Sequence, residues 1–203
     1  MKKALLIVFL VLLVDQFSKF YIKMNFLYGE EVNVLGTWFR LSFLENEGMA
    51  FGAKLPIPNA KIILSLFRIV AVSALGYYLY RIITKKEHQL YIVSIALIFA
   101  GALGNIIDST FYGLWFESSI YNGEPAKFIT QDGFTQGYSN WFHGNVVDML
   151  HFPMFKGHFP DWFPFWGGDS FLFFSPVFNV ADTAISTGVG IILFFQKRLF
   201  PKK

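Results

Sequence analysis

Three Asn-x-x-Asp pairs are the feature of this 203-residue sequence best suited to chemistry. The chain has nine Asn and seven Asp residues, for which chance predicts roughly 0.3 such pairs. On a helix, residues three positions apart are neighbours, so each Asn could orient its own Asp or a nearby substrate. The pairs are Asn105 with Asp108, Asn145 with Asp148, and Asn179 with Asp182.

Two of these carboxylates, if brought together, could hydrolyse a peptide bond without a metal ion or a nucleophilic side chain. Like charges disfavour double ionisation, so the pKa of one carboxyl rises and the pair holds one shared proton. The ionised member would take a proton from water while the protonated member polarises the scissile carbonyl. The alternative is that these aspartates are helix caps or structural hydrogen-bond partners.

Other charges in apolar segments need an explanation, because burying a charge in lipid is costly. Asp15 and Lys19 lie four residues apart on a predicted helix and can form a pair. That pair is either purely structural or borders a reaction site. We interpret Arg68 as a hydrogen-bonded strut to a neighbouring helix, or as a side chain that snorkels to the outer interface.

Several other chemistries lack the residues that they need. Without cysteine the chain has no disulfide, thiolate zinc site or cysteine nucleophile. The zinc motif His-Glu-x-x-His, the Gly-x-Ser-x-Gly elbow and the phosphate loop are also absent. His151 follows Asp148 by three residues, which leaves a metal site as an open alternative. A net charge of +3 is too small to indicate a nucleic-acid partner.

The composition places these residues in a membrane protein. Hydrophobic residues make up 54% of the chain and charged residues only 15%, whereas soluble domains carry roughly 25% charged residues. A spanning helix needs about 20 mostly apolar residues. The first candidate follows two lysines, like a secretory signal, but no cleavage site follows it, so we expect it to be retained. The four predicted spans are 4–22, 62–83, 89–107 and 177–196.

Basic residues predict the side on which each loop lies. The short pieces 1–3, 84–88 and 197–203 hold eight Lys and Arg residues, whereas the long pieces 23–61 and 108–176 hold only six. The positive-inside rule therefore places both termini in the cytoplasm and both long loops outside.

The outer loops are expected to form a cap on a small helical bundle, with 1–203 as a single domain. Polar and apolar residues partly alternate over 31–35 and 38–44, with Gly36 and Thr37 between them, which predicts a short hairpin. The stretch 158–174 is dense in Phe, Trp and Pro. Such aromatic residues suit the headgroup layer of a membrane.

Five motifs in this order resemble those of the lipoprotein signal peptidases, also called signal peptidase II, a family of bacterial membrane aspartyl peptidases. One such motif is weak evidence, but five in order over nearly the whole chain are specific. They are D-Q-x-x-K at 15–19, N-x-G-x-A-F-G at 46–52, G-x-x-G-N-x-x-D at 101–108, V-V-D at 146–148 and F-N-x-A-D at 178–182.

The resemblance implies an enzyme that cleaves diacylglyceryl-modified prolipoproteins just before the lipid-bearing cysteine, in the bacterial cytoplasmic (inner) membrane at its extracytoplasmic face. It implies four transmembrane helices with a small extracytoplasmic β-cradle, and contact with membrane lipids and cyclic-peptide inhibitors of the globomycin type. We expect no metal or other cofactor, because two carboxylates suffice for the chemistry and the sequence has no recognisable ligand cluster. The catalytic pair would be Asp148 and Asp182. The residues that bind substrate or support the site would be Asp15, Lys19, Asn46, Gly48, Asn105, Asp108, Asn179 and Ala181.

Two departures from the family pattern stand out. Ser109 occupies the position where the family usually has Arg, so Asp108 lacks its expected neighbour in the sequence. About 30 extra residues, roughly 112–144, separate Asp108 from Asp148 and should loop out on the extracytoplasmic side. Two other classes stay open: a proton- or ion-coupled transporter with the aspartates as a relay, and an inactive membrane scaffold.

Overall fold

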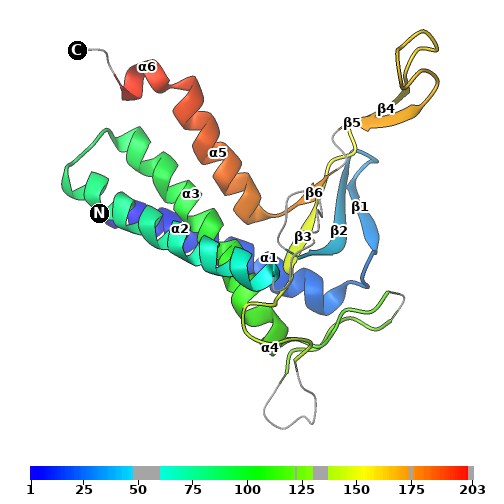
Figure 1. Ribbon diagram of the computed structural model, residues 1–203, viewed down its shortest axis with the longest axis horizontal. Helices are drawn as coiled ribbons and strands as arrows, with labels where there is room; N and C mark the ends of the chain where they lie inside the picture. Colours follow the sequence, from blue (N-terminus) through cyan, green and yellow to red (C-terminus); the bar gives the residue numbers. More distant parts are fainter. Residues whose placement is uncertain (48–59, 122, 130–136, 174–175, 201–203) are drawn as a thin grey trace.

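A computed structural model describes residues 1–47, 60–121, 123–129, 137–173 and 176–200 (Figure 1). A helical bundle occupies one side of the molecule and a β-sheet packs against one end of it. Within the described residues, three helical stretches are long and apolar enough to cross a membrane, as predicted for the first three segments. They are Lys2–Asn25 (α1), Lys61–Thr84 in α2 (Ala60–Thr84) and Gln89–Trp115.

The third stretch is longer than the prediction of 89–107. Helix α3 (Gln89–Ile107) continues through a π-helical turn, η2 (Asp108–Tyr112), into α4 (Gly113–Trp115). The inserted segment therefore leaves the helix only after Trp115, not at residue 112. A π-turn widens the helix locally and is frequent at functional sites. Here it begins at Asp108.

The fourth apolar segment is shorter than the predicted 177–196. Helix α5 covers only Val180–Phe194 and is followed by α6 (Gln196–Leu199). Fifteen residues rise about 22 Å, less than the roughly 30 Å of a hydrocarbon core. The physical reason lies at its start, where Asn179 caps the helix and Val177–Phe178 (β6) pairs with the sheet instead.

The main sheet has four antiparallel strands in the order β1-β2-β3-β6. Strands β1 (Glu31–Leu35) and β2 (Phe39–Asn46) form the hairpin predicted from 31–35 and 38–44. Strand β3 (Val146–His151) lies next to β2. A separate two-stranded sheet, β4 (Phe155–His158) with β5 (Ser170–Phe173), extends away from the body (Figure 1). The connection between its strands holds the exposed rings of Trp162 and Phe165.

Strand β3 corrects one sequence interpretation. Helical spacing was expected to bring Asn145 beside Asp148, but Asp148 lies on a strand. Side chains alternate between the two faces of a strand, so residues three apart point in opposite directions. The tertiary pairing of β3 with β2 and β6 therefore overrides the local pattern.

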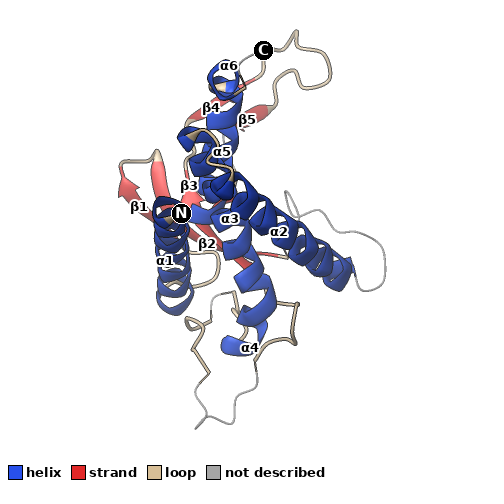
Figure 2. Cartoon of the chain, turned by 90° about the vertical axis from the view of Figure 1, so that its left-hand side faces the viewer, coloured by secondary structure: helices blue, strands red, loops and turns tan. Residues whose placement is uncertain are grey.

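Two clusters of buried apolar residues hold the bundle and the sheet together. Helix α3 packs against α1, α2 and α5, and in Figure 2 these helices lie in front of the main sheet. One cluster, which includes Ala4, Ile82 and Ile95, joins α1, α2 and α3 at the end away from the sheet. The other joins the far end of α1 to the sheet and to the inserted segment through Ile22, Phe26, Phe43, Tyr112, Phe116, Val147 and Met149.

Candidate active site

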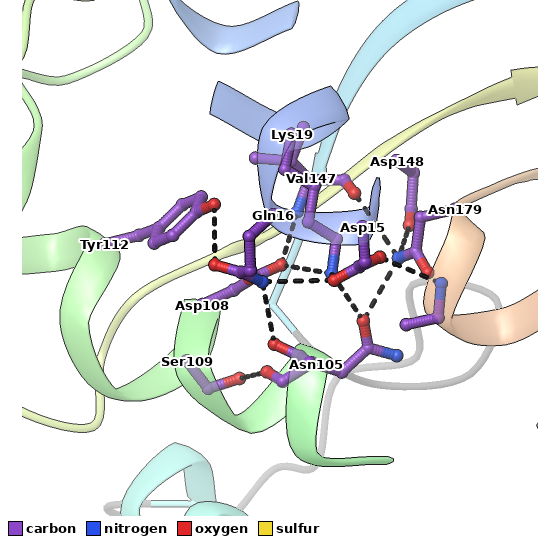
Figure 3. A network of polar contacts seen from close by, with 12 residues as sticks. Asp15, Gln16, Lys19, Asn105, Asp108, Ser109, Tyr112, Val147, Asp148 and Asn179 are labelled. Carbon is purple, nitrogen blue, oxygen red and sulfur yellow. Dashed lines mark hydrogen bonds and ion pairs between the residues drawn. The ribbon is translucent and has the colours of Figure 1, made fainter. Parts of the chain in front are cut away.

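Asp148 and Asp182 come from different elements and meet at Asn179. Asp148 is buried on β3, whereas Asp182 lies in the first turn of α5 and is partly exposed. Asn179 Nδ2 donates to Asp148 Oδ1 at 2.7 Å (Figure 3). Its Oδ1 accepts from the backbone N–H of Asp182 at 2.9 Å. One fully buried amide thus joins the two aspartates.

Local sequence explains why Asn179 can do this. It is the N-cap of α5, and its backbone N–H donates back to Asp182 Oδ2 at 3.4 Å, which completes a capping box. Asn179 and Asp182 therefore form a helix cap, which the sequence left as an alternative, and they also belong to the candidate site. Because a cap needs only the Asn179 oxygen, the amide nitrogen stays free to bond Asp148.

Asn105 orients Asp182 rather than its own sequence partner Asp108. Its Nδ2 donates to Asp182 Oδ1 at 2.8 Å, and its Oδ1 accepts from Lys19 Nζ at 2.9 Å. Asn179 Nδ2 also reaches Asn105 Oδ1 at 3.2 Å. The Asn of one Asn-x-x-Asp pair thus donates a hydrogen bond to the Asp of another pair. This contact depends on the packing of α3 against α5.

Lys19 is the centre of a buried ion cluster beside this pair. Its Nζ lies 2.9 Å from Asp15 Oδ2 and 2.8 Å from Asp108 Oδ2, and all three side chains are 0% exposed. The predicted pairing of Asp15 with Lys19 is confirmed. Asp108 therefore has an ionic partner, Lys19, although the arginine that the family usually has at residue 109 is absent. Ser109 does not take the place of that arginine, because its Oγ donates to the Asn105 carbonyl at 3.0 Å.

Gln16 belongs to this cluster, although the sequence interpretation did not single it out. Its Nε2 donates to Asp108 Oδ1 at 2.9 Å and to Asp15 Oδ2 at 3.1 Å, and its Oε1 accepts from Tyr112 Oη at 3.2 Å (Figure 3). The available signal was its place in the D-Q-x-x-K motif. Asp108 Oδ2 also accepts from the backbone N–H of Val147 at 3.4 Å, which links the cluster to β3.

The small residues of the motifs allow the helices to approach closely. Ala181 is fully buried, and its backbone N–H donates to Asp15 Oδ1 at 2.8 Å. A Cβ added at Gly104 would lie 2.6 Å from Asp15 Oδ2, and one at Gly101 would lie 2.2 Å from the Ala181 carbonyl oxygen. Side chains at either glycine would therefore push α3 away from α1 and α5.

The remaining predicted support residues lie along β2 and beyond it. Asn46 ends β2, and its Nδ2 lies 3.5 Å from Asp148 Oδ2. Gly48 falls outside the described residues. Asn145 contacts neither aspartate of the pair, because it faces the other side of the sheet.

Burial and charge give Asp148 unusual proton affinity. Burial, followed by the negative charge of Asp182, raises the pKa of Asp148 to about 7, although the hydrogen bond from Asn179 opposes that rise. Asp182 sits at the N-terminal end of α5, where the helix dipole stabilises a negative charge. The arrangement favours a protonated Asp148.

The open metal alternative has no support in the part of the chain that the structure describes. There, no three His, Asp or Glu side chains gather as metal ligands. His151 Nδ1 lies 3.0 Å from Glu31 Oε1 across the sheet, away from Asp148 in the alternation of β3. The space between Asp15 and Asp108 is filled by the Lys19 ammonium group.

A bundle of helices apolar enough to cross a membrane, with two aspartates held by one buried amide, suits the chemistry of a membrane aspartic peptidase. Residues 7–197 match the sequence model of the family described as signal peptidase (SPase) II. The chain therefore belongs to the signal peptidase II family.

Individual relatives agree with this family. A lipoprotein signal peptidase of Porphyromonas gingivalis is 46% identical over 193 residues, which cover 95% of this chain and 81% of the relative. One from Amoebophilus asiaticus is 34% identical and covers 94% of this chain and 76% of the relative. A solved bacterial membrane enzyme shares the fold, with a TM-score of 0.62 at 22% identity over 100% of this chain and 94% of that one.

Proposed function

We propose that this chain removes the signal peptide from diacylglyceryl-modified prolipoproteins, and that Asp148 and Asp182 are its catalytic pair. The observation that carries the assignment is buried Asn179, whose side-chain amide donates to the Asp148 carboxylate and whose backbone N–H donates to the Asp182 carboxylate. The family and its lipoprotein signal peptidase relatives support the substrate class. Cleavage would occur just before the lipid-bearing cysteine.

The raised pKa of Asp148 makes this residue the acid and leaves Asp182 as the base. Asp182 takes a proton from water, whose oxygen attacks the scissile carbonyl carbon, while Asp148 donates its proton to the carbonyl oxygen. Asp182 then gives its proton to the departing amine as the C–N bond breaks, and Asp148 recovers a proton from the intermediate's hydroxyl. The pair returns to its starting state, one proton having been shared throughout.

Lys19, Asp15 and Asp108 support this pair without touching the reacting atoms. Lys19 holds Asn105, which in turn holds Asp182. Asp15 anchors the first turn of α5 through Ala181. We assign Asn46 and Gly48, at the end of β2 and after it, to contacts with the substrate.

The proposed location is the bacterial cytoplasmic membrane, with both termini in the cytoplasm and the site at the extracytoplasmic face. Figure 1 shows the N-terminus, the α2–α3 connection and α6 at the end of the bundle away from the sheet. These three segments hold Lys2, Lys85 and Lys197, which supports a cytoplasmic position for that end by the positive-inside rule. Helix α5 would be the fourth crossing, with local bilayer thinning that compensates for its length.

On this topology the sheet and the inserted segment form the extracytoplasmic part of a single domain, 1–203. Substrate acyl chains stay in the lipid while the peptide reaches the sheet end of the bundle. Membrane lipids and cyclic peptides of the globomycin type are the other partners that this site would meet, and nucleic acid is not among them.

Mass spectrometry of a lipidated precursor incubated with the purified protein tests this function. The expected products are the free signal peptide and a mature chain that begins with the lipid-bearing cysteine. An uncleaved precursor, or cleavage at another bond, would contradict the assignment.

Cleavage should decline as the pH rises through about 7. The raised pKa of Asp148 keeps its proton to about that pH, and above it the pair loses the acid that polarises the carbonyl. Initial rates measured between about pH 5 and 9 should show this fall in rate on the alkaline side. A rate that keeps increasing toward the alkaline end would contradict a protonated Asp148.

Activity should survive chelation. Two carboxylates that share a proton suffice for the chemistry, and the Lys19 ammonium group already lies between Asp15 and Asp108. The rate in detergent should be unchanged after dialysis against EDTA. A strict requirement for added Zn²⁺ would point instead to His143, His151 or His158.

A further inference from the structure

A second buried ionic cluster lies behind the sheet, at the far end of α1. Lys23 Nζ is fully buried, forms an ion pair with Glu45 Oε1 and donates to Ser119 Oγ at 2.9 Å. Ser119 Oγ in turn donates to Glu45 Oε1 at 2.8 Å. Three aromatic rings surround the ammonium group with centroids 5.1 to 5.7 Å away: Phe43, Phe116 and Tyr138.

Asn145 connects this cluster to two further elements. Its Nδ2 donates to Glu45 Oε2 at 2.9 Å, and its Oδ1 accepts from Lys61 Nζ at 2.6 Å. Its backbone N–H donates to Tyr138 Oη at 2.6 Å. One residue, placed directly before β3, is therefore bonded to β2, to the first turn of α2 and to the inserted segment.

The cluster and the aspartate pair lie on opposite faces of the same two strands. Phe43 and Glu45 share one face of β2 by alternation, and both contact Lys23. Asn46, the next residue, points to the other face, where its Nδ2 lies near Asp148. In the register, Glu45 pairs with Val147 and Leu44 with Asp148. A shift of Glu45 along the strand would therefore move Asn46 relative to Asp148.

We propose that Asn145 is a positioning residue for the Asp148–Asp182 pair, because it ties Glu45 and Lys61 to the start of β3 and so fixes the register of β2 against β3. This inference rests on the proposed function. It also gives the inserted segment a role, since Ser119, Phe116 and Tyr138 supply much of the wall around Lys23.

The test compares Asn145→Ala, Lys61→Met and the double variant in cleavage of a lipidated precursor. Asn145→Ala should lower kcat by roughly 10- to 100-fold, because a small misplacement near reacting groups is costly, with little change in KM. Lys61→Met should lower kcat by roughly tenfold. The double variant should be no slower than Asn145→Ala, because both act through one network.

Asn140→Ala is the matched control, since this exposed asparagine lies in the same segment and, among the residues that the structure describes, only its backbone carbonyl takes part in a hydrogen bond. It should keep the wild-type kcat. Unchanged kcat in Asn145→Ala, or losses that add up in the double variant, would overturn the proposal. If Asn145→Ala does not fold, an unchanged kcat in Lys61→Met overturns it in the same way.

Amide hydrogen exchange separates this inference from the proposed function. Asn145→Ala should increase exchange in peptides that contain β2 and β3, while peptides from α3 keep their protection. An inactive wild-type protein would contradict the proposed function only. Unchanged exchange in the two strands would contradict the positioning role whatever the substrate is.

Discussion

Asp148→Asn and Asp182→Asn should each reduce cleavage by a factor on the order of 10³ or more, because proton transfer to and from the substrate stops. Asparagine keeps nearly the same shape. At residue 148 its oxygen can still accept from Asn179 Nδ2. The measurement is the rate of precursor cleavage by each purified variant.

The Asp148→Asn variant should lose activity without losing thermal stability. The pKa of Asp148 is raised in the folded protein to about 7, whereas an unfolded Asp titrates near 3.9. Ionised Asp148 therefore costs folding free energy, and this cost grows as the pH rises from about 4 to about 7 and stays above that. A neutral amide removes it, so the melting temperature of Asp148→Asn should match or exceed that of the wild type at alkaline pH.

Two control variants test whether Asp148 and Asp182 are the catalytic pair. Asp161→Asn, at an exposed position near β4, should leave cleavage unchanged. Asp108→Asn should weaken but not abolish turnover, because Lys19 keeps Asp15 as a counter-ion. Substantial activity in either Asp148→Asn or Asp182→Asn would refute the pair. If Asp108→Asn alone were inactive, the pair would be Asp108 and Asp182.

Lys19→Met should cause the largest loss of stability among single changes in the site. It leaves the fully buried carboxylates Asp15 and Asp108 without their cation. Breaking a buried ion pair by removing one partner costs about 3–5 kcal/mol. Cleavage should fall as well, because Asn105 loses the ammonium group that orients it toward Asp182. Thermal unfolding in detergent measures the first effect.

The matched control is Lys127→Met, whose ion pair with Glu124 is largely exposed at 3.2 Å. Exposed pairs contribute about 0–1 kcal/mol, so this variant should melt close to the wild type. Adding Asp15→Asn and Asp108→Asn to Lys19→Met should restore part of the lost stability, since no uncompensated charge then remains. A loss in Lys19→Met no larger than that in Lys127→Met would contradict the buried cluster.

Much of the framework was predictable because it depends on local patterns. Alternation and Gly36 located the β1–β2 hairpin, and a spacing of four residues located the Asp15–Lys19 pair. Apolar length identified the first three helices. The fourth span was predicted too long, because hydropathy does not show that Val177–Phe178 joins a sheet before Asn179 starts a helix.

The partners of the polar residues were less predictable. Lys23 counted only as a basic residue of an outer loop, yet it is buried against Glu45. The spacing of Asn145 and Asp148 suggested a helix, whereas a strand places them on opposite faces. The partner of both Lys23 and Asn145 is Glu45, which is distant from them in the chain, and no local pattern specifies such a partner.

The sequence by itself determined the membrane character, the family motifs and the residue types that can share a proton. Composition and motif order are properties of the chain alone, so no packing is needed to read them. The tertiary structure decided that Asn179 joins Asp148 to Asp182, that Asn105 donates to Asp182, and that Lys19 is a counter-ion of Asp108. These pairings depend on how closely α1, α3 and α5 approach, and that distance is set by the glycines and the sheet together.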